Sequence, residues 1–360
     1  MKTTNASWSG WIAYAAAGWS LVYGLFGVYW SLDGGGFPFG VERDPLGEKV
    51  SILEHVQQDA AAPVIAVLGF AGALLAVVLA RARAGGPVGA ALVGMAGLAA
   101  VSLALVIPDY RPLTAVGRTP VFLVGRVFFD WPKGVDFFGP GMFDGPVLHQ
   151  FLLIGGGLTW AGAAVAYRRR VRAACGDCGR TGETADGWTT PAGAARWGRR
   201  AVVVAVAVPL VYAVTRWVFA LAIPLGYATE GIRREARESP GIWWAGAGLA
   251  TFGAVGAILT VGLVQRWGEV FPRWIPFLGG KPVRPRTAII PATFVAVIVT
   301  EAGLMFNRAL VLGYMPLDDP GDLVLSAPAH LWTLWGLALG AATLAYHLRR
   351  RGRCGTCGQH

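Results

Sequence analysis

Four cysteines form two similar short motifs, which are the residues of this chain best suited to hold a metal ion. Cys175 and Cys178 lie in C-G-D-C-G, and Cys354 and Cys357 lie in C-G-T-C-G. Two residues between the cysteines let both thiolates of a tight turn face one ion, and the following glycine permits the backbone twist that points amides at sulfur. Two such turns complete a tetrahedral site. We therefore predict a closed, structural four-cysteine zinc site.

The same spacing leaves other interpretations of the cysteines open. A redox-active dithiol pair, an iron centre of the rubredoxin type, and thiols that share no metal within one chain all fit it. A structural disulfide is disfavoured because we expect the motifs to lie in the reducing cytosol. The two motifs are 179 residues apart, so only a fold that places both on one face of a membrane can bring them together.

Three ionisable residues lie inside stretches that are otherwise apolar enough to cross a membrane: Arg216, Glu301 and Arg308. A charge in lipid is costly, so such residues are either paired with one another or functional. Glu301 and Arg308 are two helical turns apart and share a helix face. We predict a buried ion pair or triad that either stabilises the fold or binds a substrate or proton.

Two histidines are candidate ligands near the outer ends of predicted spans. His149 precedes Tyr167 by 18 residues, and His330 precedes Tyr346 by 16. Two facing imidazoles can ligate haem or a metal, but a histidine at a helix start is more often an interfacial polar residue, so we do not expect haem. The chain has no C-x-x-C-H motif for covalent haem attachment.

The cysteine motifs end two matching stretches, which indicates an internal duplication. In each stretch an apolar helix ends in a tyrosine (Tyr167 or Tyr346), arginines follow, and the cysteine motif begins eight residues after the tyrosine. We predict three regions: a first four-helix repeat at 1–180, a cytoplasmic linker at 181–200 and a second four-helix repeat at 201–360. An even number of spans in each half makes the halves parallel.

Composition places the chain in a membrane. It is 54% hydrophobic and only 14% charged, with a mean hydropathy of +0.51, whereas about a quarter of the residues in soluble domains are charged. A span needs roughly 20 apolar residues. Eight stretches qualify: Trp11 to Ser31, Ala61 to Ala80, Pro87 to Ile107, Val147 to Ala166, Ala201 to Pro224, Ile242 to Val264, Thr287 to Val311, and Pro328 to Tyr346. The predicted fold is an all-α polytopic membrane protein with two parallel four-helix repeats.

The distribution of charge gives the orientation. Segments predicted to be cytoplasmic hold 20 Lys and Arg against 4 Asp and Glu, while outer segments hold 9 against 16. This positive-inside pattern predicts a multi-pass protein of a bacterial plasma membrane with both termini in the cytoplasm. It also explains the net charge of +10 without nucleic acid, so the expected partner is the lipid bilayer. The long outer segments 32–60 and 108–146 are expected to be ordered, and residues 120–131 to lie flat at the lipid interface.

Motifs of common enzymes are absent from the sequence. It has no Walker loop, no G-x-G-x-x-G after a strand, no H-E-x-x-H and no G-x-S-x-G, which argues against an ATP-driven pump, a nucleotide enzyme, a zincin-type protease and a common serine hydrolase. We therefore expect no enzymatic activity. Three functions stay open: a membrane scaffold or small-molecule binder, a secondary transporter using Arg216, Glu301 and Arg308, and a redox protein using the histidines or cysteines.

Short patches resemble known sequences. The stretch Y-W-S-L-D-G-G-G, beginning at Tyr29, is similar to a Y-W-A-L-G-G stretch of uncharacterised multi-span membrane proteins from GC-rich bacteria, although Asp33 interrupts the pattern. Those proteins have no established activity, so the resemblance implies a membrane location and no functional residue.

Overall fold

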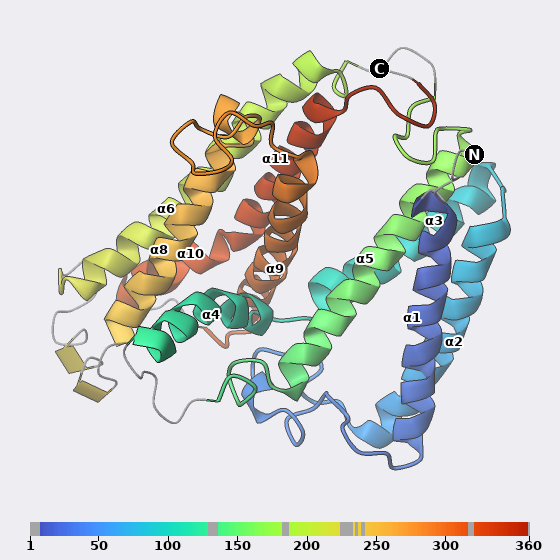
Figure 1. Ribbon diagram of the computed structural model, residues 1–360. Helices are drawn as coiled ribbons and strands as arrows, with labels where there is room; N and C mark the ends of the chain where they lie inside the picture. Colours follow the sequence, from blue (N-terminus) through green and yellow to red (C-terminus); the bar gives the residue numbers. More distant parts are fainter. Residues whose placement is uncertain are drawn as a thin grey trace. The chain divides into compact units, whose positions relative to one another are not determined.

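The described part of the chain is all-α. The computed structural model describes residues 8–128, 136–181, 187–223, 233–234, 237–238, 242–315 and 320–358. Within these ranges the one pairing of extended backbone is an isolated bridge between Val270 and Pro282. The helices are α1 (Trp8–Ser31), α2 (Gln58–Arg81), α3 (Gly86–Val101), α4 (Arg111–Phe128), α5 (Gly145–Val171), α6 (Pro191–Ala220), α8 (Ile242–Val261), α9 (Pro285–Val311), α10 (Pro320–His330) and α11 (Trp332–Arg350) (Figure 1). A π-helix, η2 (Ser102–Val106), continues α3, and short 3₁₀ turns lie at Pro45–Gly47 (η1) and Arg266–Gly268 (η3).

Six described helices are long and apolar enough to cross a membrane: α1, α2, α3 with η2, α5, α6 and α9. They coincide with six of the predicted spans, so the chain has the helices of a membrane protein. In α8, the apolar stretch that the structure describes is shorter and covers Gly246–Val261. The region predicted as the last span is divided between α10 and α11, which are separated at Leu331. The count of eight spans therefore stays a prediction.

The chain divides into two compact units that alternate along the sequence. Unit 1 comprises Met1–Asp109, Phe143–Ala185 and Arg351–His360, and unit 2 comprises Tyr110–Met142 and Asp186–Arg350. The segment that contains α4 thus belongs to unit 2, and the last ten residues of the chain belong to unit 1. Each of these segments joins the unit built mainly from the other half of the chain. Whether the halves are copies of one another stays a prediction.

Small residues bring the helices of unit 1 close together. Helix α1 packs along α2 and α5, and α5 packs on α3. Gly27 of α1 lies against Ala66 of α2, and Gly157 of α5 lies against Ala100 and Ala104. The absence of side-chain atoms at these glycines lets the helix backbones approach, as expected for helices that associate in lipid.

The helices of unit 2 pair in the same order. Helix α6 packs on α8 and α11, and α11 packs on α9. Gly336 of α11 lies against Ala296 and Thr300 of α9, in the way that Gly157 lies against α3 and η2 in unit 1. Unit 2 has in addition α4, which contacts α8 and α9.

Helix α4 covers most of the segment predicted to lie flat at the lipid interface. Arg111 and Ala115 are buried in its first part, whereas Val127 and Phe128 at its end are exposed. The rest of the predicted segment, residues 129–131, lies outside the described residues. The helical part agrees with the expectation that this region is ordered, while its depth in a bilayer stays a prediction.

The same side chains anchor the ends of α5 and α11, each inside its own unit. The Tyr167 hydroxyl donates to the Ala84 carbonyl at 2.6 Å, and the Tyr346 hydroxyl donates to the Gly268 carbonyl at 2.7 Å. Three residues further on, Arg170 donates to the Leu79 carbonyl at the end of α2, and Arg349 donates to the Leu263 carbonyl just after α8. The Arg170 bond satisfies a carbonyl group that the end of α2 leaves without an intrahelical partner. The other three bonds tie the connectors after α2 and α8 to α5 and α11.

Candidate metal centre

The cysteine motifs form two turns with the same backbone geometry. In the first turn the Gly179 amide donates to the Cys175 carbonyl at 2.8 Å, and in the second the Gly358 amide donates to the Cys354 carbonyl at 2.9 Å. Gly179 and Gly358 have φ angles of +76° and +73°, in the left-handed region that glycine enters without a steric penalty. The glycine after each second cysteine therefore has the role that the sequence suggested.

The two turns place all four sulfur atoms together within unit 1. The Sγ atoms of Cys175 and Cys354 are 3.9 Å apart, and those of Cys178 and Cys357 are 3.6 Å apart. All four Sγ atoms lie within 4.8 Å of one another. Zinc–sulfur bonds of about 2.3 Å in a tetrahedron place the sulfurs about 3.8 Å apart. Two of the sulfur pairs lie at this separation, and all four cysteines are close enough together to bind one metal ion.

Backbone amides in each turn favour the thiolate form of its first cysteine. The amide of Cys178, followed by that of Asp177, lowers the pKa of the Cys175 thiol, and burial partly opposes this effect. The amides of Cys357 and Thr356 lower the pKa of the Cys354 thiol to about 6. Hydrogen bonds to sulfur stabilise the charged form. The turns are therefore prepared for a cation before any ion binds, since the thiolate is the metal ligand.

Arginines and one polar contact hold the two turns beside each other. Arg180 donates to the Gly352 carbonyl at 3.2 Å, and Arg351 donates to the Cys178 carbonyl at 3.4 Å. The Thr356 hydroxyl donates to Asp177 Oδ2 at 2.5 Å. Four thiolates around a divalent ion carry a net charge of −2, so neighbouring guanidinium groups favour the loaded state. The C-terminal tail and the loop after α5 therefore meet through both sulfur and hydrogen bonds.

The three charged residues predicted inside spans all belong to unit 2. Glu301 is fully buried in α9. Arg308 lies near the end of the same helix, and Arg216 of α6 places its guanidinium 4.8 Å from the ring centre of Tyr212. The pairing of these three charged residues stays a prediction, and so does its role, structural or functional.

Sequence reasoning missed several buried ionisable residues, and two of them lie in one short segment after α3 and η2. Asp109 in unit 1 is 1% exposed and accepts a bond from Gln150 Nε2 at 2.9 Å, while its amide donates to Gln150 Oε1 at 3.0 Å. Arg111 in unit 2 is 5% exposed. Both lie in D-Y-R directly after a predicted span, where charged residues are ordinarily at the water interface. Their position in the sequence therefore predicted exposure to water, and their burial could not be inferred from it.

The two candidate histidines differ in their surroundings. His149 lies in the first turns of α5, and its Nε2 atom is 2.7 Å from the Tyr23 hydroxyl. Aromatic rings of Trp30 and Phe39 also pack around it. His330 is the last residue of α10 in unit 2, and within the described residues its ring nitrogens are buried without a hydrogen-bond partner. The two histidines belong to different units, and a shared ligand stays a prediction.

Comparison with known proteins adds no relative. No protein-family model matches the chain, and no curated protein or solved structure is significantly similar to it. Function is therefore inferred from the geometry of the described residues.

Proposed function

We propose that this is an integral membrane protein of the bacterial plasma membrane, a scaffold or small-molecule-binding protein whose C-terminal tail is held by a structural zinc ion. One observation carries the metal assignment: four sulfur atoms from two separate chain segments lie within 4.8 Å of one another. Cys175, Cys178, Cys354 and Cys357 would be the ligands. A site closed by four thiolates leaves no position for a substrate, so the ion would stabilise structure.

The charge distribution supports a cytoplasmic location for this centre. Both cysteine motifs lie in segments rich in arginine, and such segments are retained on the cytoplasmic side. Cytosolic thiols are kept reduced and available for a metal. Both termini and both turns would then lie on the same side of the bilayer.

An internal duplication of four helices accounts for the recurrence of the turns. The same order of helix pairing in the two units supports it. So do the tyrosine and arginine bonds at the ends of α5 and α11, whose donors are separated by the same 179 residues as the cysteines. A duplicated four-helix repeat that ends in a two-cysteine turn supplies two half-sites, which together complete one metal site.

Elemental analysis of the purified protein tests the proposal. We expect one zinc ion per chain in the wild type and none in the double variant Cys354→Ser/Cys357→Ser, because two ligands cannot hold a structural ion. Gly355→Ala is the matched control, since a Cβ at this exposed position meets no atom within 4 Å, and it should keep its zinc. Metal retained by the double variant would contradict the site. Iron in place of zinc in the wild type would indicate a rubredoxin-type centre, and a haem absorption band would favour the redox alternative.

The complete burial of Glu301 supports a second candidate, a secondary transporter that moves protons through unit 2. A fully buried carboxylate in a candidate span is costly and is a common element of proton pathways. Proteoliposomes with an imposed potassium diffusion potential and a pH-sensitive dye inside test it. Wild-type protein should admit protons faster than empty liposomes, and Glu301→Gln should not. Equal rates for all three samples would exclude proton movement through this site.

A further inference from the structure

The connector between α8 and α9 forms a closed loop, here called the α8–α9 hairpin (residues 269–283). The bridge between Val270 and Pro282 closes it. Around this bridge the Phe271 amide donates to the Lys281 carbonyl at 3.0 Å, and the Val283 amide donates to the Glu269 carbonyl at 2.9 Å. The Gly280 amide also donates to the Phe271 carbonyl at 2.9 Å. Because its backbone groups are bonded to one another, the hairpin has a defined conformation without any partner.

The end of α11 fixes the base of the hairpin. Arg349 contacts Glu269 at 3.3 Å, and Arg350 donates to the Val283 carbonyl at 2.9 Å. Tyr346 holds the neighbouring Gly268 carbonyl. The first and last residues of the hairpin are thus both bonded to one helix of the same unit, which leaves its tip as the free end.

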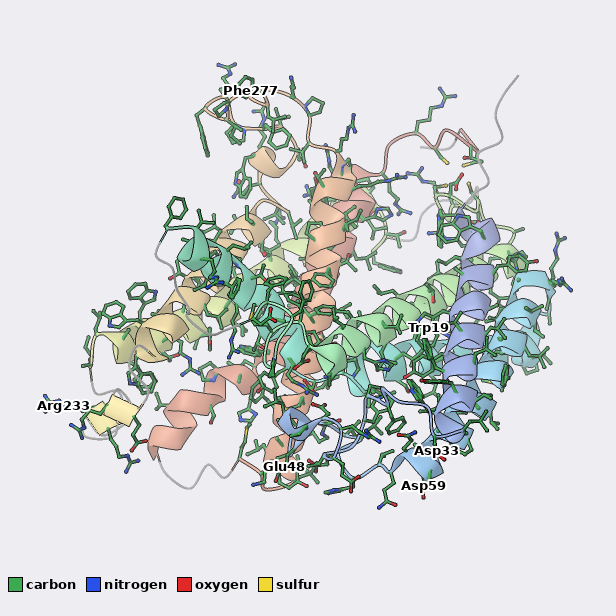
Figure 2. The ribbon with its side chains drawn as sticks, turned by 60° about the horizontal axis from the view of Figure 1, so that its bottom comes forward. Trp19, Asp33, Glu48, Asp59, Arg233 and Phe277 are labelled. Carbon is green, nitrogen blue, oxygen red and sulfur yellow. The ribbon has the colours of Figure 1, made fainter. Side chains whose placement is uncertain are left out.

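The tip carries large apolar side chains in full contact with solvent. Phe277 is 94% exposed and Trp274 is 81% exposed, and Leu278 beside them is 43% exposed. Figure 2 shows Phe277 on the outer side of this loop. Phe277 also has a φ angle of +62°, a left-handed conformation that is unfavourable for a bulky residue and is found mainly where function requires it. The most exposed ring of the tip thus belongs to a residue with an unfavourable backbone conformation.

Basic residues lie within the hairpin and on both sides of its base. Arg266, Arg273, Lys281, Arg284 and Arg286 are all exposed. The one acidic residue between positions 265 and 286 is Glu269, which is bonded to Arg349. The hairpin thus combines an apolar tip with a positive flank, which is the composition of segments that insert into the interface of anionic membranes.

We propose that the α8–α9 hairpin inserts Trp274 and Phe277 into the boundary between headgroups and acyl chains of an anionic bilayer, with its basic residues on the lipid phosphates. The bilayer is favoured over an acidic protein because the hairpin ends two residues before α9, a candidate span that begins at Pro285. The hairpin is therefore close to the membrane surface. This inference rests on the proposed membrane location and is independent of the metal site.

Photocrosslinking in lipid nanodiscs tests the contact directly. The variant Phe277→p-benzoylphenylalanine is irradiated in nanodiscs of phosphatidylcholine alone or mixed with phosphatidylglycerol, and its adducts are identified by mass spectrometry. We expect lipid adducts, several-fold more abundant in the anionic mixture. Adding Arg273→Gln and Lys281→Gln should remove the dependence on phosphatidylglycerol. Adducts to protein, or a lack of lipid adducts, would overturn the proposal. So would a yield of lipid adducts that is the same with and without phosphatidylglycerol.

A control position separates this inference from the membrane assignment. Leu98 of α3 is 68% exposed in a candidate span, so Leu98→p-benzoylphenylalanine should give lipid adducts equally in both compositions. If Leu98 labels lipid and Phe277 does not, the hairpin proposal fails while the membrane assignment stands. If neither labels lipid, the membrane assignment fails as well.

A glycine variant distinguishes a lipid contact from a structural role. Phe277→Gly removes the ring and relieves the left-handed strain, so the apparent Tm in detergent should stay unchanged or rise. In anionic nanodiscs, amide hydrogen exchange over residues 271–281 should become several-fold faster than in the wild type. A lower Tm, or unchanged exchange in anionic nanodiscs, would show that the ring does not serve as a lipid contact.

Discussion

The two units share a pattern of contacts but differ in the chemistry placed on it. In unit 1 a glycine of α5 contacts α3, and in unit 2 a glycine of α11 contacts α9. In both units a tyrosine and an arginine at the end of the glycine-bearing helix donate to carbonyl groups of neighbouring segments. Only unit 2 has Arg216, Glu301 and Arg308 inside its candidate spans, whereas the described cysteine cluster lies in unit 1. The glycine, tyrosine and arginine contacts are thus found in both units, and the cysteine motif is found twice in the sequence, whereas the three charged residues are found in unit 2.

The division of roles agrees with the physics of each kind of position. A helix contact in lipid depends on small residues that let backbones approach, and nearly any larger residue disrupts it. A charged residue in a span is costly unless it is paired or used. Each close helix contact therefore needs a small residue in its own unit, whereas a charged residue in a span needs a partner or a function.

The largest expected effect comes from filling the glycine contact in each unit. A Cβ at Gly157 would lie 2.8 Å from the Ala100 carbonyl oxygen, and a Cβ at Gly336 would lie 2.7 Å from the Ala296 carbonyl oxygen. Both contacts are closer than van der Waals packing allows, so Gly157→Ala and Gly336→Ala should each destabilise the protein by about 1–3 kcal/mol. Thermal unfolding in detergent measures this loss.

Gly155→Ala provides the matched control for these variants. Gly155 lies on the same helix as Gly157, and a Cβ there meets no atom within 4 Å. Alanine is the better helix former by up to about 1 kcal/mol, so this variant should be neutral or stabilising. A large loss for only one of Gly157→Ala and Gly336→Ala would mean that the two contacts are not equivalent in energy.

A smaller effect is expected from the tyrosine anchors. Tyr167→Phe and Tyr346→Phe each remove one hydrogen bond from a buried ring, with a cost of about 1 kcal/mol. The Tyr346 bond also holds the base of the α8–α9 hairpin, so Tyr346→Phe should speed amide exchange around Gly268. Tyr167→Phe should leave exchange there unchanged. Faster exchange in both variants would argue against separate anchors.

Much of the secondary structure could be predicted because its signals are local. Length and hydropathy mark the spans, so α1, α2, α3, α5, α6 and α9 coincide with predicted segments. The sequence also indicated the four-cysteine cluster, although its turns are far apart, because the repeated motif implied that they belong together. Repetition carried information about distance that a single C-x-x-C could not supply.

The features that sequence reasoning missed depend on contacts between distant segments. The burial of Asp109 depends on Gln150, 41 residues away. Helix α4 packs on α8 and α9, which the composition of its own segment does not reveal. The exposure of Phe277 depends on how α11 holds the base of the hairpin. The contacts of Asp109 and of α4 leave no period or motif in the sequence, and the repeated tyrosine–arginine stretch does not indicate that it holds this hairpin.

The smallest effect concerns the two turns of the metal centre and the acidity of their thiols. Backbone amides lower the pKa of Cys354 to about 6, so in metal-free protein its thiolate persists above about pH 6 and is protonated below it. Alkylation of Cys354, followed by peptide mass spectrometry, should slow as the pH falls through this value. Thr356→Pro removes one donating amide and should raise the midpoint, whereas Thr356→Val keeps that amide, loses only the hydroxyl bond to Asp177, and should leave the midpoint near 6. Equal midpoints in the two variants would show that the Thr356 amide does not lower the pKa of Cys354, and the lowering would then have to come from the Cys357 amide and the neighbouring sulfurs.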